Sequence, residues 1–143
     1  MVELSAINQN GVLVGKWQSI SQSKNKGTLT IEKDYLTLNA NNTFSILLLV
    51  SIQKGDAFVK DLQIKGSGIW SVHNNTLVYV IKKVDVPFAK EVYLISQQSL
   101  LQLANFFKKR LTDKPIRINT IQRMDGKHLT LINEREIVTR YTR

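Results

Sequence analysis

Short segments of strand character, separated by turn residues, run through almost the whole chain and limit its fold more than any other feature. Residues 77–83 show the pattern, since Leu77, Tyr79 and Ile81 would share one face of an extended segment. Asp125-Gly126 is typical of a tight hairpin turn. We expect strands within residues 14–21, 28–32, 35–39, 43–53, 58–65, 66–72, 77–83, 90–95, 116–124, 128–133 and 137–141.

Strands joined by such short turns predict a mainly β, antiparallel fold, because a parallel sheet needs a long crossover, usually a helix, between its strands. The number and spacing of the segments favour an up-and-down β-barrel of about eight to ten strands.

One segment breaks the strand pattern and predicts a single amphipathic helix near residues 97–111. Leu100, Leu103 and Phe107 recur at helical spacing and would share one face. Ser96 precedes them and is a suitable N-cap, because its hydroxyl can accept a hydrogen bond from the first helical turn.

The composition predicts one domain over residues 1–143, with 43% apolar and 22% charged residues. The absence of cysteine excludes disulfides and zinc sites with thiolate ligands. The N-terminus lacks the pattern of a signal peptide, and the longest apolar run, residues 46–50, is far shorter than the roughly 20 residues of a spanning helix. We expect a soluble protein, either cytoplasmic, or periplasmic or secreted after removal of a leader.

Four sequence features together resemble the lipocalin-like (calycin) group, in a bacterial-type variant. They are Gly15-Lys16-Trp17, the strand–turn–strand at residues 36–44, Gly68-Ile69-Trp70, and the closing Arg140-Tyr141-Thr142-Arg143. The chain departs from the family by lacking a Thr-Asp-Tyr turn and by placing three strands after the helix. The resemblance implies a lipocalin-like barrel over most of the chain.

The resemblance also implies how the barrel closes. In that family the tryptophan of the Gly-x-Trp step closes the base, and an arginine near the last strand stacks on it. Carried over to this chain, Gly15 and Trp17 form the closing step, and Arg140 or Arg143 is the stacking partner. A cation over an indole contributes roughly 0.5–2 kcal/mol.

No arrangement of residues in the sequence indicates catalysis. The chain has two histidines, His73 in a predicted turn and His128 at the start of a predicted strand. Its closely spaced carboxylate pairs are Glu32 with Asp34 and Glu134 with Glu136. We interpret all of these as surface groups, and we expect no enzyme activity, no catalytic residues, no metal site and no cofactor.

The favoured functional hypothesis is a binding protein that holds a small apolar or amphipathic ligand in the barrel. Inward-facing side chains of a barrel of this size either fill it or surround one small ligand. The expected ligand-binding residues are Phe44, Leu48, Trp70, Tyr79, Tyr93, Leu103 and Phe107.

Net charge supports an alternative hypothesis. The formal charge is +9, and the segment from Ser96 to the end of the chain holds ten Lys or Arg against four Asp or Glu. Within this segment, Lys108, Lys109 and Arg110 form a basic surface cluster beside Phe106. Such a cluster favours a basic module that binds a polyanion, either nucleic acid or an anionic membrane surface, or an acidic protein.

A third hypothesis is a partner-binding domain that forms a homodimer through a sheet edge.

Overall fold

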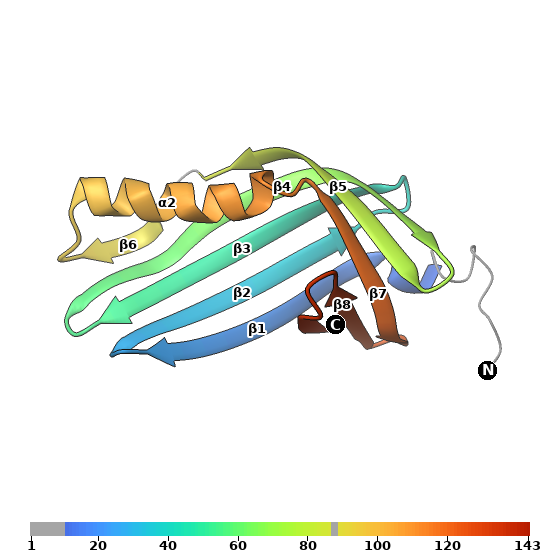
Figure 1. The fold of residues 1–143 in the computed structure, drawn as a ribbon, viewed down its shortest axis with the longest axis horizontal. Helices are drawn as coiled ribbons and strands as arrows, with labels where there is room; N and C mark the ends of the chain where they lie inside the picture. The colour runs from blue at the N-terminus through green and yellow to red at the C-terminus, as the bar shows by residue number, and fades with distance from the viewer. Residues whose placement is uncertain (1–10, 87–88) are drawn as a thin grey trace.

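The strands of this protein pair side by side into a closed antiparallel barrel (Figure 1). The computed structural model describes residues 11–86 and 89–143, apart from the side chain of Lys90. The strands in these ranges are β1 (Gly15–Asn25), β2 (Thr28–Leu38), β3 (Thr43–Lys54), β4 (Ala57–His73), β5 (Thr76–Asp85), β6 (Ala89–Tyr93), β7 (Ile116–Met124), β8 (His128–Asn133) and β9 (Val138–Thr142). The long helix is α2 (Gln97–Thr112).

The order of the strands closes the barrel. Neighbours follow the order β3-β2-β1-β9-β8-β7-β5-β4, and β4 also pairs with β3. The remaining strand, β6, extends the sheet beyond β4. This arrangement confirms the predicted antiparallel barrel with an amphipathic helix near residues 97–111.

Two strands, β2 and β4, each join two of the segments that the sequence predicts. β2 runs without a break through Lys33 and Asp34, because β1 and β3 pair with it on both sides. β4 continues for 17 residues because it changes partner instead of ending, pairing first with β6 and then with β5. A register shift between Ser67 and Gly68 interrupts the pairing with β5. No side chain fits at Gly68, since an added Cβ would overlap the carbonyl oxygen of Val80.

Helix α2 begins and packs as its pattern predicts. The Ser96 hydroxyl accepts a hydrogen bond from the Ser99 amide at 3.1 Å and caps the first turn. Phe107 and Leu111 are the buried residues of the helix. Leu111 packs beside Gly66 of β4, where an added Cβ would lie 3.8 Å from Leu111 Cδ1, an ordinary van der Waals distance.

The barrel base is closed by Trp17 and Arg143, together with Leu13 and Gly15. The Trp17 indole is 1% exposed, and its Nε1 donates a hydrogen bond to the Leu13 carbonyl at 2.8 Å. The Arg143 guanidinium carbon lies 3.9 Å from the centre of the Trp17 ring. Of the two arginines that the resemblance left open, Arg143 therefore lies on Trp17, and Arg140 is an exposed residue of β9.

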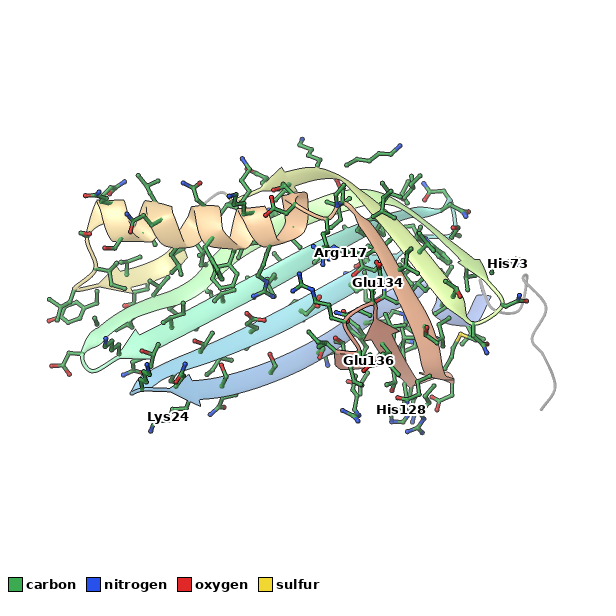
Figure 2. All side chains as sticks on the ribbon, viewed as in Figure 1. Lys24, His73, Arg117, His128, Glu134 and Glu136 are labelled. Atoms are coloured by element: carbon green, nitrogen blue, oxygen red, sulfur yellow. The ribbon has the colours of Figure 1, made fainter. Side chains whose placement is uncertain are left out.

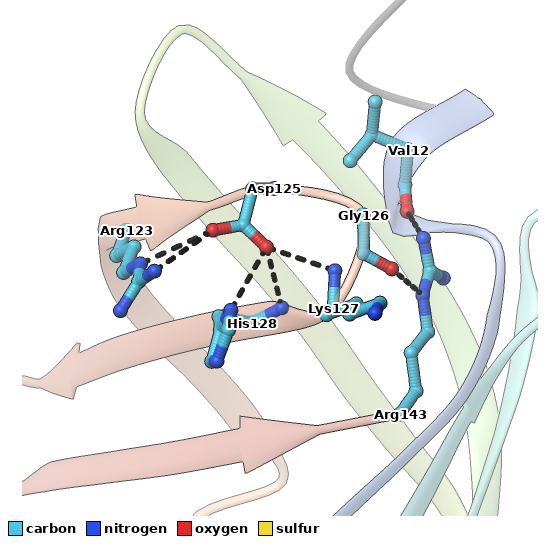
Figure 3. Close-up of polar contacts among 7 residues, drawn as sticks. All are labelled: Val12, Arg123, Asp125, Gly126, Lys127, His128 and Arg143. Carbon is cyan, nitrogen blue, oxygen red and sulfur yellow. Dashed lines mark hydrogen bonds and ion pairs between the residues drawn. The ribbon is translucent and has the colours of Figure 1, made fainter.

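Hydrogen bonds hold Arg143 in this place. Its Nη1 donates to the Val14 carbonyl at 2.8 Å, its Nη2 to the Val12 carbonyl at 2.6 Å, and its Nε to the Gly126 carbonyl at 2.9 Å. Figure 3 shows the contacts with Val12 and Gly126 beside the turn between β7 and β8. Gly15 leaves room for the guanidinium, because a Cβ there would lie 2.8 Å from Arg143 Nη1. The base thus joins both ends of the described chain.

No helix in residues 11–86 and 89–143 is long and apolar enough to cross a membrane.

Candidate functional site

Strand alternation determines which polar side chains enter the barrel. Trp17 and Leu36 occupy paired positions on β1 and β2, and both are buried. Even-numbered residues of β2 therefore face inward, which places Glu32 and Asp34 on the inner face. Asp34 pairs in register with Leu48 of β3, which is buried. A carboxylate in such surroundings needs a polar partner.

Tyr141 of β9 supplies that partner. Its hydroxyl donates a hydrogen bond to Asp34 Oδ2 at 2.9 Å. The other oxygen, Asp34 Oδ1, is buried and has no hydrogen-bond partner among the described residues. One half of the carboxylate is therefore satisfied, and the other half is free to accept a hydrogen bond.

Asp34 is a weaker acid than an ordinary aspartate, mainly because it is buried. It raises the pKa of this carboxyl group from its ordinary value of 3.8 to about 6. The hydrogen bond from Tyr141 opposes the increase, the charge of Glu32 adds to it, and the charge of Arg110 opposes it. Asp34 is therefore mostly, but not wholly, ionised at neutral pH.

Two further interior residues, Tyr79 and Asn119, lie close to this pair. Burial raises the pKa of Tyr79, the charge of Asp34 raises it further, and Arg117 and Asn119 lower it. Asn119 is 6% exposed, and its side chain lies close enough to Tyr79 to lower the pKa of that phenol, but its Nδ2 makes no hydrogen bond of ordinary length among the described residues. Burial also raises the pKa of Tyr141, with Asp34 and Tyr79 adding to the effect.

Tyr141 is bonded to Asp34, and the pairing of β5 with β7 places Asn119 beside Tyr79 on the same face. We refer to Asp34, Tyr79, Asn119 and Tyr141 as the central polar cluster. They come from four strands, β2, β5, β7 and β9. The cluster contains both a free acceptor and a free donor, so it can bind a polar group that enters the barrel.

Two arginines connect helix α2 to β2 and β7, two of the strands that carry the cluster. Arg110 forms a bidentate pair with Glu32, with Nη1–Oε1 at 2.9 Å and Nη2–Oε2 at 3.4 Å. Arg117 donates from Nε to the Lys114 carbonyl at 2.7 Å and from Nη2 to the Arg110 carbonyl. Figure 2 shows Arg117 where β7 passes the C-terminal end of α2. These contacts fix the end of the helix against β2 and β7.

The sequence-predicted ligand residues divide into two groups. Six of them belong to the core or pack against it: Phe44, Leu48, Trp70 and Phe107 are buried, and Tyr79 and Leu103 are partly buried. Tyr79 and Phe44 are in contact, with ring centres 5.1 Å apart. Tyr93 is 53% exposed on β6 and stacks on Phe58 at 5.7 Å, so it lies outside this group.

The sequence-predicted basic residues also divide. Lys108 and Lys109 are exposed. Arg110 is bound to Glu32 and lies 5.2 Å from the centre of the Phe107 ring. Arg110 therefore belongs structurally to the connection between α2 and β2.

The histidines lie apart from the central polar cluster. His73 is at the hairpin between β4 and β5, and His128 begins β8 (Figure 2). His128 Nδ1 lies 3.1 Å from Asp125 Oδ1, within the β7–β8 turn (Figure 3). Backbone hydrogen bonding from Lys127, with smaller effects of His128, holds the pKa of Asp125 well below its usual range. No group of three or more potential metal ligands occurs in residues 11–86 and 89–143.

Two hollows lie on the surface of the sheet. One, of about 410 Å³, is bordered by residues of β3, β4 and β5, including Ser45, Ser67 and Lys83. The other, of about 310 Å³, is bordered by β2, β3 and β4, including Ile31 and Phe58. Neither hollow includes a residue of the central polar cluster.

Sequence reasoning missed most of the central polar cluster. It treated Asp34 as a surface charge and did not select Asn119. The available signal was alternation, since Arg117, Asn119 and Ile121 share one face of a strand. A polar residue on an inward face marks a candidate binding site only once the opposite strands are known.

Comparison of the chain with protein-family models and with curated proteins finds no match.

Proposed function

We propose that this chain is a non-enzymatic, lipocalin-like binding protein that holds a small amphipathic ligand inside its barrel. The observation that carries the proposal is the pair of unpartnered, buried polar atoms, Asp34 Oδ1 and Asn119 Nδ2, among the described residues. An unsatisfied buried polar group costs about 1–3 kcal/mol, and a ligand that binds to it recovers part of that cost.

The surroundings of the cluster support an amphipathic ligand. Leu48 pairs with Asp34 in register, and the Phe44 ring contacts Tyr79. Apolar surface buried against such side chains contributes roughly 25 cal/mol per Å². A few polar groups among apolar ones are typical of small-molecule sites, where they orient the ligand.

A neutral fluorescent dye tests this proposal. We expect Nile red to bind the folded protein with an increase in fluorescence, and octanol to displace it. The matched variants are Asn119→Leu inside the barrel and Gln122→Leu at an exposed position of β7. The inner variant is expected to weaken displacement by octanol, while the outer variant leaves it unchanged. Absence of Nile red binding to the folded protein contradicts the proposal.

The net charge of +9 favours a second candidate function, binding to a polyanion. Lys108 and Lys109 are exposed beside Phe106, which is 59% exposed. This function predicts binding to DNA, RNA or anionic vesicles that weakens steeply with salt. The double variant Lys108→Glu/Lys109→Glu should abolish it, whereas Lys24→Glu, at the far end of β1, should not. Association that is absent at low salt excludes this candidate.

A further inference from the structure

We infer that the polar head of the ligand is a neutral group that both donates and accepts a hydrogen bond, such as a hydroxyl or a primary amide, bound between Asp34 and Asn119. This inference rests on the proposed function, because it names the class of ligand for the same site.

The two free atoms define the first requirement. Asp34 Oδ1 can accept a hydrogen bond, and Asn119 Nδ2 can donate one. Tyr79 pairs with Arg117 across β5 and β7, which sets Asn119 beside Tyr79 on the same face, and the charge of Asp34 also acts on Tyr79. A hydroxyl or a primary amide satisfies both atoms, whereas an ammonium group has no acceptor for Asn119.

The charges around the cluster define the second requirement. Glu32 and Asp34 carry two negative charges, and Arg110 and Arg117 carry two positive charges. Arg110 is paired with Glu32, and Arg117 donates to backbone carbonyl groups. Arg110 and Glu32 therefore balance each other, whereas no ion pair with Asp34 occurs among the described residues, so an anionic head would bury a second uncompensated negative charge beside Asp34. A carboxylate head would also lie against the free oxygen of Asp34.

Competition among ligands with the same alkyl chain tests the inference. Octanol, octanamide, octanoate and octylamine are compared as competitors of bound Nile red at neutral pH. We expect octanol and octanamide to compete at concentrations at least about tenfold lower than octanoate, the factor that one hydrogen bond to a charged group represents. Octylamine can donate to Asp34 but cannot accept from Asn119, so competition by octylamine that is stronger than that by octanol overturns the inference.

Two variants make the test specific to Asp34. Asp34→Asn keeps the shape of the side chain and removes its charge, so the affinity for octanoate relative to octanol should rise by about tenfold. Asp56→Asn makes the same change at the exposed turn between β3 and β4 and should leave the ratio unchanged. Because the readout is a ratio within each variant, a general loss of stability does not imitate the effect.

The outcomes separate this inference from the proposed function. Equal competition by all four compounds, or a ratio that Asp34→Asn does not change, overturns the inference while ligand binding stands. If Nile red binds and none of the four compounds displaces it, the head-group inference is wrong. If Nile red does not bind, the proposed function fails, and the inference fails with it.

Discussion

The barrel base and the central polar cluster both contain buried polar groups, but these groups are satisfied in different ways. At the base, the Trp17 indole N–H and three nitrogens of Arg143 each donate to a backbone carbonyl group. In the cluster, Asp34 and Asn119 each keep a buried atom without a partner among the described residues. The base is therefore complete within the described chain, whereas the cluster can gain hydrogen bonds from a ligand.

This difference separates stability from binding. Changes at the base remove contacts that the folded chain already makes, so they should lower its stability. Changes in the cluster remove groups that are incompletely satisfied, so they should affect binding more than stability.

The largest effect is expected for Trp17→Ala, which removes a fully buried indole. We expect the free energy of unfolding to fall by about 3–5 kcal/mol, as measured by urea denaturation. Tyr93→Ala is the control, because Tyr93 is 53% exposed, and its effect should be below about 1 kcal/mol. Similar losses for the two variants contradict the assigned role of the base.

A smaller loss is expected for Gly15→Ala. The Gly15 φ angle of 136° is unfavourable for alanine, and the new Cβ would crowd Arg143. We expect a loss of about 2–3 kcal/mol. In the double variant with Arg143→Ala the loss should be less than the sum of the single losses, because the crowded group is absent. If the losses of the two single variants simply add up in the double variant, crowding of Arg143 is not the cause of the loss in Gly15→Ala.

Asp34 predicts a characteristic dependence of stability on pH. Its folded pKa of about 6 exceeds the ordinary 3.8, so between these values the folded state binds more protons than the unfolded state. The contribution of Asp34 is therefore greatest below about pH 4 and is lost as the pH rises through 6. The loss should be about 2–3 kcal/mol by pH 7.

Comparison with the Asp34→Asn variant separates the contribution of Asp34 to the pH dependence of stability from the contributions of the other carboxylates. The difference in free energy of unfolding between the variant and the original protein should change by that amount between about pH 4 and pH 7. A difference that stays constant with pH contradicts the assigned burial of Asp34.

The smallest effect on stability is expected for Asn119→Leu. Because this change removes an unsatisfied buried amide, the free energy of unfolding should stay within about 1 kcal/mol of the original value. Octanol binding should nevertheless weaken. A large loss of stability would show that the Asn119 amide already makes hydrogen bonds in the folded protein, as the polar groups of the base do. That result would contradict the difference between the cluster and the base.

Local patterns in the sequence predicted the barrel and the helix. The alternation in residues 77–83 and the helical spacing of Leu100, Leu103 and Phe107 each depend on neighbouring residues, and the structure contains the corresponding strand and helix. The continuous β2 and β4 were not predicted, because their length depends on partner strands.

The central polar cluster could not be predicted in the same way. Asp34 is an ordinary charged residue in the sequence, and its burial depends on Tyr141, 107 residues away along the chain. Asn119 likewise acquires its interior position through closure of the barrel. Local alternation indicates which face of a strand a residue occupies, but it does not indicate which residues of distant strands lie opposite.

The most direct measurement follows two N–H groups by NMR as octanol is added to isotope-labelled protein. We expect the side-chain amide signals of Asn119 to shift, while the indole N–H signal of Trp17 stays in place. A shift of the Trp17 signal with an unchanged Asn119 amide would show that octanol does not bind at the central polar cluster.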